Sequence, residues 1–352
     1  MTAQPRTILF KINRFKINPF KSGLFGITFF KSKFFKTKLF KVLLAVAAVA
    51  LLAVAETVFA AGTTFNVTKT ADTNDGSCDS SDCSLREAII AANTNSSTLG
   101  TDTINVPAGT YTLTRAGIPD DTSAAGDLDI LQDVTIVGAG KDSTIINGNN
   151  LDRVFQNVFT NVTVKMSGMT ITGGNGNPGG GAYNAGTATF DNVRFAGNSA
   201  GEGGAMQNEG TATITNSEFI SNSVVGSWGG AISQQNPSGK LSLTNTTVNG
   251  NTAPSNGGGI NMNGNLDLDR VTFTGNLSGG GSGGGVLIFR GHATIKDSTF
   301  ANNHADGEQG NSFPPGGNQG GGIYLNEVTG TPSSITNSIF SGNSAVVGGR
   351  YL

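Results

Sequence analysis

The chain has 352 residues, of which 52 are glycine and only 13% are charged, and its formal net charge is −2. Ten of the 22 basic residues but only one of the 24 acidic residues lie in residues 1–60, so the rest of the chain has 12 basic and 23 acidic residues, a net charge of −11. An acidic surface disfavours binding to nucleic acid and to anionic membranes. We therefore expect no nucleic-acid partner.

Residues 1–60 have the pattern of a secretory signal peptide with an extended basic start, in which phenylalanine recurs every five residues from 10 to 40 and is usually followed by lysine. A thirteen-residue apolar run at 42–54 leads to small residues before a cleavage point after Ala60. The run is shorter than the roughly 20 residues that a membrane-spanning helix needs. We expect an exported, extracellular or cell-surface protein, with outer-membrane association as an alternative and no transmembrane span in the mature chain.

Cys78 and Cys83 are the only cysteines. In an exported chain a disulfide between them is the leading interpretation, and closing so short a loop stabilises the fold by about 2 kcal/mol in the chain-entropy model. A zinc site is not expected, because the only histidines, His292 and His304, lie far along the chain.

Acidic residues gather around this disulfide and offer a possible calcium site, although their spacing is not that of an EF-hand loop. The candidate ligands are the acidic residues Asp72, Asp75, Asp79 and Asp82, together with Asn74. An acidic turn without a metal is the preferred interpretation, and we expect no metal site and no cofactor.

Directly after the second cysteine, Ser84 and Glu87 have the spacing of a capping box. Apolar residues then follow at helical spacing, which predicts a short helix over 84–93 that closes one end of the fold. Residues 104–106, 107–109 and 111–113 are typical of strand, turn and strand. We assign residues 63–115 to an N-terminal cap with the disulfide loop, the helix and a first coil, and 116–352 to the repeats described next.

Six times a bulky apolar residue is followed three positions later by asparagine. The pairs are Phe195/Asn198, Phe219/Asn222, Val248/Asn251, Phe273/Asn276, Phe300/Asn303 and Phe340/Asn343. A diglycine followed by a small or branched apolar residue recurs with them, as at 180–182 and 203–205. Self-similarity at roughly 23 to 40 residues identifies a repeat architecture.

Within one unit, alternation such as Leu241-Ser-Leu243 marks a strand with one buried face. Asparagine or aspartate usually stands three positions before the bulky apolar residue, as at Asn192 and Asn216, and favours a turn. A second strand ends in the recurrent asparagine, and a third follows the diglycine. Three short strands and three corners predict an all-β fold, a right-handed parallel β-helix built as a solenoid of three-strand coils with a short N-terminal capping helix.

Equivalent positions in neighbouring coils lie directly above one another, roughly 4.8 Å apart. The recurrent phenylalanines therefore predict an internal aromatic stack. The six asparagines predict an internal ladder in which each amide bonds to the next and to turn groups. Both features hold the scaffold together, so a ligand is expected to meet the outward side chains and the variable loops.

The segment Cys83-Ser-Leu-Arg-Glu-Ala88 resembles the signature of bacterial CSLREA-domain proteins, which are secreted right-handed β-helices, and residues 104–113 fit the same opening. The repeats resemble those of polymorphic outer membrane proteins, which are surface-exposed and adhesin-like. Together the similarities cover residues 63–349 and imply a pectin-lyase-like fold, which hosts both enzymes and adhesins. The sequence stops where another Gly-Gly strand should begin, so we expect a truncated piece of a longer protein.

Polysaccharide-cleaving β-helices need carboxylates on the outer face of neighbouring coils, two of them in hydrolases, or a calcium site and a base in lyases. The best group here is Asp267 and Asp269, which alternate with buried leucines, beside Arg270 and one coil before His292. Further candidates are Asp120 with Asp121, Asp127 with Asp129, and His292 with Lys296. A solvated sheet face also requires outward polar residues, and a surface pair is worth under about 1 kcal/mol.

The regular coils without a reactive cluster predict no enzyme activity. The leading hypothesis is a non-enzymatic secreted or cell-surface scaffold, adhesin-like or structural, that presents an extended surface to extracellular carbohydrate, cells or matrix. The alternative is an extracellular polysaccharide lyase, hydrolase or epimerase that uses the Asp267, Asp269, Arg270 and His292 face.

Overall fold

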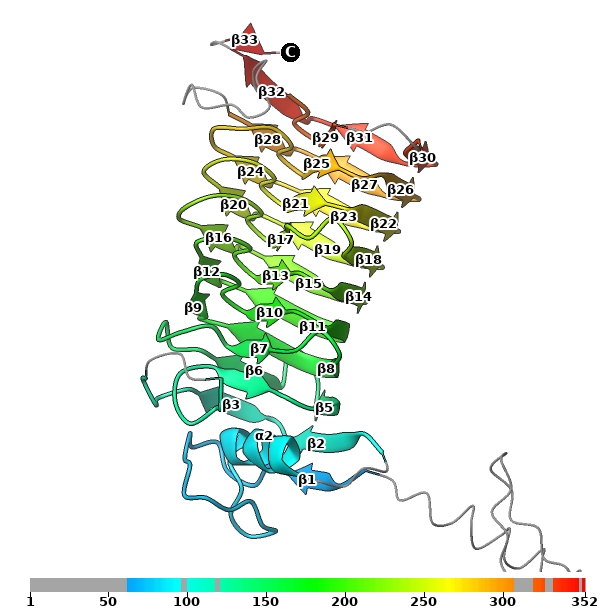
Figure 1. Cartoon of the computed structure of the whole chain (residues 1–352). Helices are drawn as coiled ribbons and strands as arrows, with labels where there is room; N and C mark the ends of the chain where they lie inside the picture. Colours follow the sequence, from blue (N-terminus) through cyan, green and yellow to red (C-terminus); the bar gives the residue numbers. More distant parts are fainter. Residues whose placement is uncertain are drawn as a thin grey trace, which may run out of the picture. The chain divides into compact units, whose positions relative to one another are not determined.

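The computed structural model describes residues 62–95, 100–117, 121–306, 319–326, 332–347 and 350–351. The predicted signal peptide and Asp120 lie outside these residues. The described part is all-β except for one helix, and its strands stack as successive coils (Figure 1). The predicted parallel β-helix with a capping helix is confirmed.

The strands form three sheets. Sheet A has 17 strands, namely β1 (Thr64–Asn66), β2 (Asp102–Val106), β3 (Gly109–Thr112), β5 (Val134–Gly138), β6 (Thr144–Asn147), β8 (Thr163–Thr172), β11 (Thr187–Ala196), β14 (Thr211–Thr215), β15 (Glu218–Ile220), β18 (Lys240–Thr244), β19 (Thr247–Asn249), β22 (Asn265–Asp269), β23 (Thr272–Thr274), β26 (Ala293–Lys296), β27 (Thr299–Ala301), β30 (Ser334–Thr336) and β31 (Ile339–Ser341). Sheet B has eight, namely β4 (Leu128–Ile130), β7 (Phe155–Asn157), β10 (Ala182–Asn184), β13 (Met206–Asn208), β17 (Ile232–Gln234), β21 (Ile260–Asn263), β25 (Val286–Arg290) and β29 (Ile323–Leu325). Sheet C has eight, namely β9 (Asn175–Gly176), β12 (Ser199–Ala200), β16 (Ser223–Val224), β20 (Thr252–Ala253), β24 (Leu277–Ser278), β28 (His304–Ala305), β32 (Ser344–Val347) and β33 (Arg350–Tyr351).

Each regular coil passes through sheet A twice, then through sheet C, and returns through sheet B. Neighbouring coils pair in parallel, as between β11 and β14, and only β33 pairs antiparallel among the described strands. The two-residue strand after the recurrent asparagine is an addition to the three strands predicted per unit. It arises because the ladder asparagine turns the chain without ending its pairing to the next coil.

The bend between the two passes through sheet A lies at the residue three positions before the repeat phenylalanine. These residues have positive φ, namely Asn192 (54°), Asn216 (52°), Asn245 (49°), Arg270 (54°), Asp297 (50°) and Asn337 (49°). Asparagine and aspartate tolerate this conformation because their side chains bond locally. The predicted turn is confirmed, and it aims the following phenylalanine into the interior.

The predicted aromatic stack is present with one interruption. Ring centroids are 5.0 Å apart for Phe195 and Phe219, 4.8 Å for Phe273 and Phe300, and 4.9 Å for Phe300 and Phe340, with nearly parallel planes. Val248 occupies the same register between Phe219 and Phe273. Offset ring contacts of this kind add to the burial of apolar area, so the stack supports the repeat without forming a site.

The recurrent asparagines form a continuous hydrogen-bonded row. Each side-chain Nδ2 donates to the Oδ1 of the next asparagine, at 3.0 Å from Asn198 to Asn222, from Asn222 to Asn251 and from Asn251 to Asn276, then 2.8 Å to Asn303 and 2.9 Å to Asn343. Each Oδ1 also accepts the backbone N–H of the preceding asparagine, as from Asn222 to Asn251 at 2.9 Å. The row begins at Gly174, whose N–H donates to Asn198 at 2.9 Å. Buried turn groups are therefore satisfied, as the ladder requires.

A second amide ladder, which we did not predict, runs along the end of sheet B. Asn157 donates to Asn184 at 2.8 Å, Asn184 donates to Asn208 at 2.6 Å, and Asn208 donates to Gln234. All four side chains are buried. Its signal in the sequence is an amide two positions after Ala182 in one unit and three positions after Ala205 and Ala231 in the next two.

Candidate functional site

The predicted catalytic group lies on the outer face of sheet A. Asp267 and Asp269 point outward from β22 on either side of the buried Leu268, and Asp267 is exposed. Nη1 of Arg270 lies 2.7 Å from Oδ2 of Asp269, and its Nε donates to Oδ1 of Asn245 at 2.7 Å. Asp269 and Arg270 thus form a surface ion pair.

His292 does not join this pair. The register of β22 and β26 sets Asp267 against Thr294 and Asp269 against Lys296, so His292 lies level with Asn265. Within the described residues, neither the His292 ring nor the Asp267 carboxylate makes a side-chain hydrogen bond or ion pair. The four residues share one face, but only two of them are brought into contact.

The prediction that Asp127 and Asp129 point outward is wrong. Asp127 and Asp129, expected as outward candidates, are buried at 2% and 1% exposure. Asp127 accepts from Nε of Arg153 at 2.9 Å, and burial raises the pKa of its carboxyl despite this arginine. Asp129 accepts the backbone N–H of Ser123 at 2.8 Å. They lie inside because the segment that follows residue 121 folds back over β4, which period-two alternation does not reveal. Lys296 pairs with Asp297 at 3.3 Å instead of with His292.

The disulfide end is built around the motif at 83–88. Cys78 and Cys83 are disulfide-bonded, and helix α2 (Leu85–Thr94) begins at the predicted capping box of Ser84 and Glu87. Glu87 accepts from the Ser84 backbone at 2.7 Å, from Thr73 Oγ1 at 2.8 Å and from the Asp75 backbone at 3.0 Å. Burial raises the pKa of the Glu87 carboxyl, but these bonds outweigh burial and lower it from 4.5 to about 2.

Three carboxylates at this end lie close enough to share a cation. Ligand oxygens of Asp75, Asp82 and Glu87 lie within 4.8 Å of one another. The Lys69 ammonium lies among them, 3.7 Å from Asp75, 3.4 Å from Glu87 and paired with Asp82. A hydrogen bond with Asp82 is the main cause that raises the pKa of Lys69. The chain thus supplies its own cation where we considered calcium.

The other residues of that calcium alternative have separate roles. Asp79 accepts from the backbone and hydroxyl of Ser81, at 2.7 Å each, and so closes its own turn. Asp72 accepts from Nε of Arg86 at 2.7 Å and from the backbone N–H groups of Thr114 at 2.7 Å and Arg115 at 3.0 Å. These bonds tie the acidic turn to the first coil.

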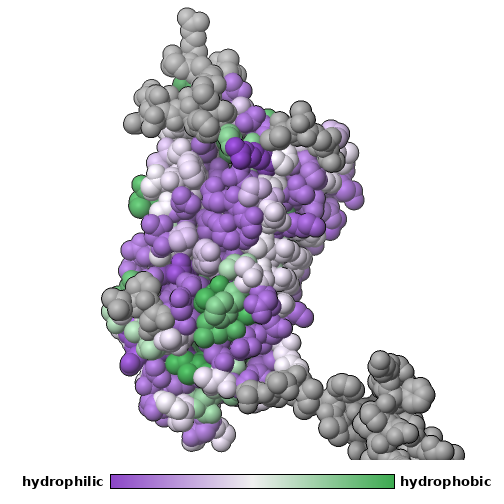
Figure 2. Space-filling view, in the orientation of Figure 1, coloured by the Kyte–Doolittle hydropathy of each residue, from purple (hydrophilic) through white to green (hydrophobic). Residues whose placement is uncertain are grey.

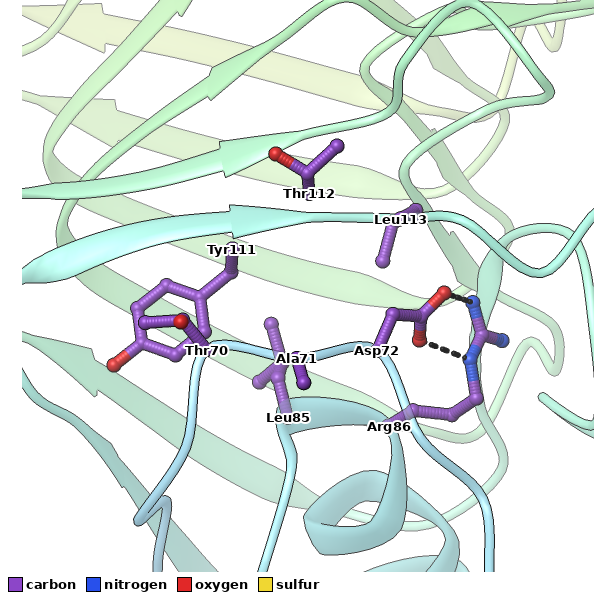
Figure 3. A pocket seen from close by; sticks show the side chains of 8 residues that line it. All are labelled: Thr70, Ala71, Asp72, Leu85, Arg86, Tyr111, Thr112 and Leu113. Carbon is purple, nitrogen blue, oxygen red and sulfur yellow. Dashed lines mark hydrogen bonds and ion pairs between the residues drawn. The ribbon is translucent and has the colours of Figure 1, made fainter.

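All three nitrogens of the Arg86 guanidinium donate hydrogen bonds that hold the cap together. Besides Asp72, it donates to the carbonyl oxygens of Ser123 and Gly126, at 2.9 Å each, and of Asp127 at 3.2 Å. Figure 3 shows the pair with Asp72 beside a cavity of about 10 Å³, room for about one water molecule. This cavity is too small for an organic ligand. Every position of the motif at 83–88 serves the cap: in chain order they supply a disulfide cysteine, the N-cap, a core contact, two buried charges and a second core contact.

A larger, open hollow of about 340 Å³ lies beside the cap. Its lining includes Asn95, Asp102 and Asp133. Asp102 accepts the backbone N–H of Thr63 at 2.7 Å, and Asp133 accepts that of Thr163 at 2.7 Å. Because each carboxylate accepts a backbone hydrogen bond, these two residues do not form a pair of free carboxylates suited to catalysis.

The most extended polar feature is a row along the outer face of sheet A. Register places the following half-buried or exposed residues in line, one per coil: Thr64, Thr103, Thr135, Lys165, Thr189, Thr213, Ser242, Asp267, Thr294 and Ser334. Eight of the ten carry a hydroxyl group. Figure 2 shows a largely hydrophilic surface over the regular coils, with apolar residues gathered nearer the N-terminal end.

The structure also brings together a group that we did not predict, formed by Tyr183, Glu202, Gln207 and Glu209 on the outer side of sheet B. Its signal in the sequence is Glu202, which stands before a diglycine where the other units have uncharged residues.

The fold defines a parallel β-helix, consistent with the pectin-lyase-like architecture. Comparisons with family models, curated proteins and solved structures found no match to this chain. None of the helices in the described part is long and apolar enough to cross a membrane.

Proposed function

We propose that this chain is a non-enzymatic β-helix scaffold outside the bacterial cell, related to CSLREA-domain and polymorphic outer membrane proteins, that binds extracellular carbohydrate along sheet A. The observation that carries the proposal is the hydroxyl row. Side chains repeated at roughly 4.8 Å along the coil axis can meet successive units of an extended glycan. The interior ladders and the aromatic stack use inward side chains, so a ligand would meet outward side chains such as those of this row.

The test is binding of the intact protein to arrayed and insoluble polysaccharides. Thr189→Ala with Thr213→Ala removes two central hydroxyls of the row. If each hydrogen bond contributes about 1 kcal/mol, the affinity should fall about 30-fold. Ser223→Ala, on β16 of sheet C, is the matched control and should bind normally. Equal binding by both variants would remove sheet A as the binding face.

The alternative is a polysaccharide-active enzyme that uses Asp267 and Asp269. It draws support from the alignment of two outward carboxylates with Arg270, but they are not joined to His292 in the apo geometry. Incubation with polysaccharides and reducing-end analysis tests it. Turnover that disappears in Asp267→Ala with Asp269→Ala, together with no binding to any surface, would overturn the scaffold proposal.

A further inference from the structure

Gln207 is an outward residue of sheet B that solvent does not reach. Alternation in β13 turns Met206 and Asn208 inward and Gln207 outward, yet Gln207 is only 1% exposed. The preceding corner folds over it. Gly203 has φ of +60°, and a Cβ there would lie 2.9 Å from the Gln207 backbone N. This corner carries Glu202 to the same side of the sheet as Gln207.

One carboxylate is hydrogen-bonded to this amide, and a second carboxylate and a phenol lie near the first. Nε2 of Gln207 donates to Oε1 of Glu209 at 2.5 Å, and Tyr183 of the neighbouring coil is the register partner of Gln207. Burial, and then the charge of Glu209, raise the pKa of the Glu202 carboxyl. The same two causes raise the pKa of Tyr183. We call Tyr183, Glu202, Gln207 and Glu209 the Glu202 cluster.

The Glu202 cluster has no internal counter-charge. No ion pair within the described residues includes Glu202 or Glu209. The nearby Arg153 lies over the Tyr183 ring at 5.6 Å, and its charge opposes the burial that raises the pKa of Tyr183. Its hydrogen bonds go to Asp127, to the Pro178 carbonyl and to Gln156. Oε1 of Gln207 is buried and makes no hydrogen bond within the described part. Because its amide is bound to Glu209, this free oxygen belongs to the same cluster.

The coil itself does not require these groups. Backbone hydrogen bonds link the residue before each diglycine into a row, in which Glu202 stands among Pro178, Trp228, Asn256, Ser282 and Gln319. Register replaces Gln207 by Ser233 in the next coil. The same corner thus forms without a charge at the Glu202 position, so the corner itself does not require this glutamate.

We propose that Glu202, Gln207 and Glu209 bind a divalent cation of the calcium class, with Tyr183 at the edge of the site. Calcium takes carboxylate and amide oxygens together with water as ligands. A bound cation neutralises the two glutamates and gives the unpartnered amide oxygen a partner. The proposal does not depend on what sheet A binds.

Isothermal titration calorimetry of the full chain with CaCl₂ tests the site. We expect one site with a dissociation constant of about 10⁻⁴ to 10⁻³ M, as in extracellular calcium modules. Glu202→Gln with Glu209→Gln should weaken binding at least tenfold. Asp75→Asn with Asp82→Asn, which alters the carboxylates around Lys69, is the matched control and should leave calcium binding unchanged.

Thermal unfolding shows whether a variant that binds calcium weakly is still folded. Without calcium, Glu202→Gln should melt at or above the wild-type temperature, because it removes a desolvated charge beside Glu209. With calcium in excess, the wild type should gain stability and the variant should not. Absence of binding at about 10 mM calcium, well above the expected constant, would overturn the proposal. So would binding that survives the glutamate variants and disappears in the control.

Discussion

The N-terminal cap and the regular coils satisfy their buried polar groups by different means. The cap uses charges that occur once, such as the pair of Arg86 with Asp72 and the carboxylate of Glu87. The coils use neutral amides that recur in register, as in the row from Asn198 to Asn343. A unique buried charge has no substitute when it is removed, whereas a repeated amide shares its role with its neighbours. The cap should therefore be sensitive to single substitutions and to pH, and the coils should be less so.

The largest effect is expected at Arg86. Arg86→Met leaves the buried Asp72 carboxylate without its counter-charge and removes the arginine donor from three carbonyl oxygens. Removing one partner of a buried pair costs about 3–5 kcal/mol. Urea unfolding followed by circular dichroism measures it. The double variant with Asp72→Asn should recover part of the loss, since the amide oxygen can still accept from Thr114 and Arg115. A cost for Arg86→Met below about 1 kcal/mol, the range of a surface pair, would contradict a structural role.

The pH dependence of the cap comes next. Since the pKa of Glu87 is about 2 when folded and 4.5 ordinarily, its contribution is fully present above pH 4.5 and is lost as the pH falls toward 2. The difference corresponds to about 3 kcal/mol. The free energy of unfolding, measured from pH 7 to pH 2, should fall accordingly in the wild type. Glu87→Gln should be less stable at pH 7 and show a flatter profile, and an unchanged slope would contradict the assignment.

A smaller and pH-independent effect is expected in the coils. Asn251→Leu breaks the ladder in the middle and leaves turn groups unpaired, at a cost of about 1–3 kcal/mol. Asn249→Leu, two residues earlier on the exposed face of β19, is the matched control and should cost under about 0.5 kcal/mol. Urea unfolding at pH 7 and at pH 4 measures the free energy of unfolding of both variants. Equal stability of the two variants would show that the ladder contributes nothing. If the free-energy loss caused by Asn251→Leu depended strongly on pH, the proposed difference between coils and cap would be wrong.

The repeat allowed most of the fold to be predicted from sequence. The turn at Asn192, the aromatic stack and the first ladder all follow from one period, because stacked coils carry any residue in register to the same place. The capping box at Ser84 and Glu87 was equally readable, since it depends on contacts within one helical turn. The second ladder also repeats in register, but its spacing from the diglycine differs between units: Asn184 lies two residues after Ala182 and Asn208 three after Ala205.

Contacts made by irregular segments could not be predicted in this way. Asp127 and Asp129 alternate like surface residues but are covered by the preceding segment. Lys69 reaches the carboxylates of Asp75 and Glu87 only because the cap folds back on itself.

The sequence by itself thus determined the coil, its interior and the helix that caps it, because those features depend on spacing along the chain. The tertiary structure alone decided which charges are buried, which carboxylates hold an internal cation and which, like Glu202 and Glu209, lack one. Those outcomes depend on how loops fold over the sheets, and the distances between charges across a loop are not encoded in any period.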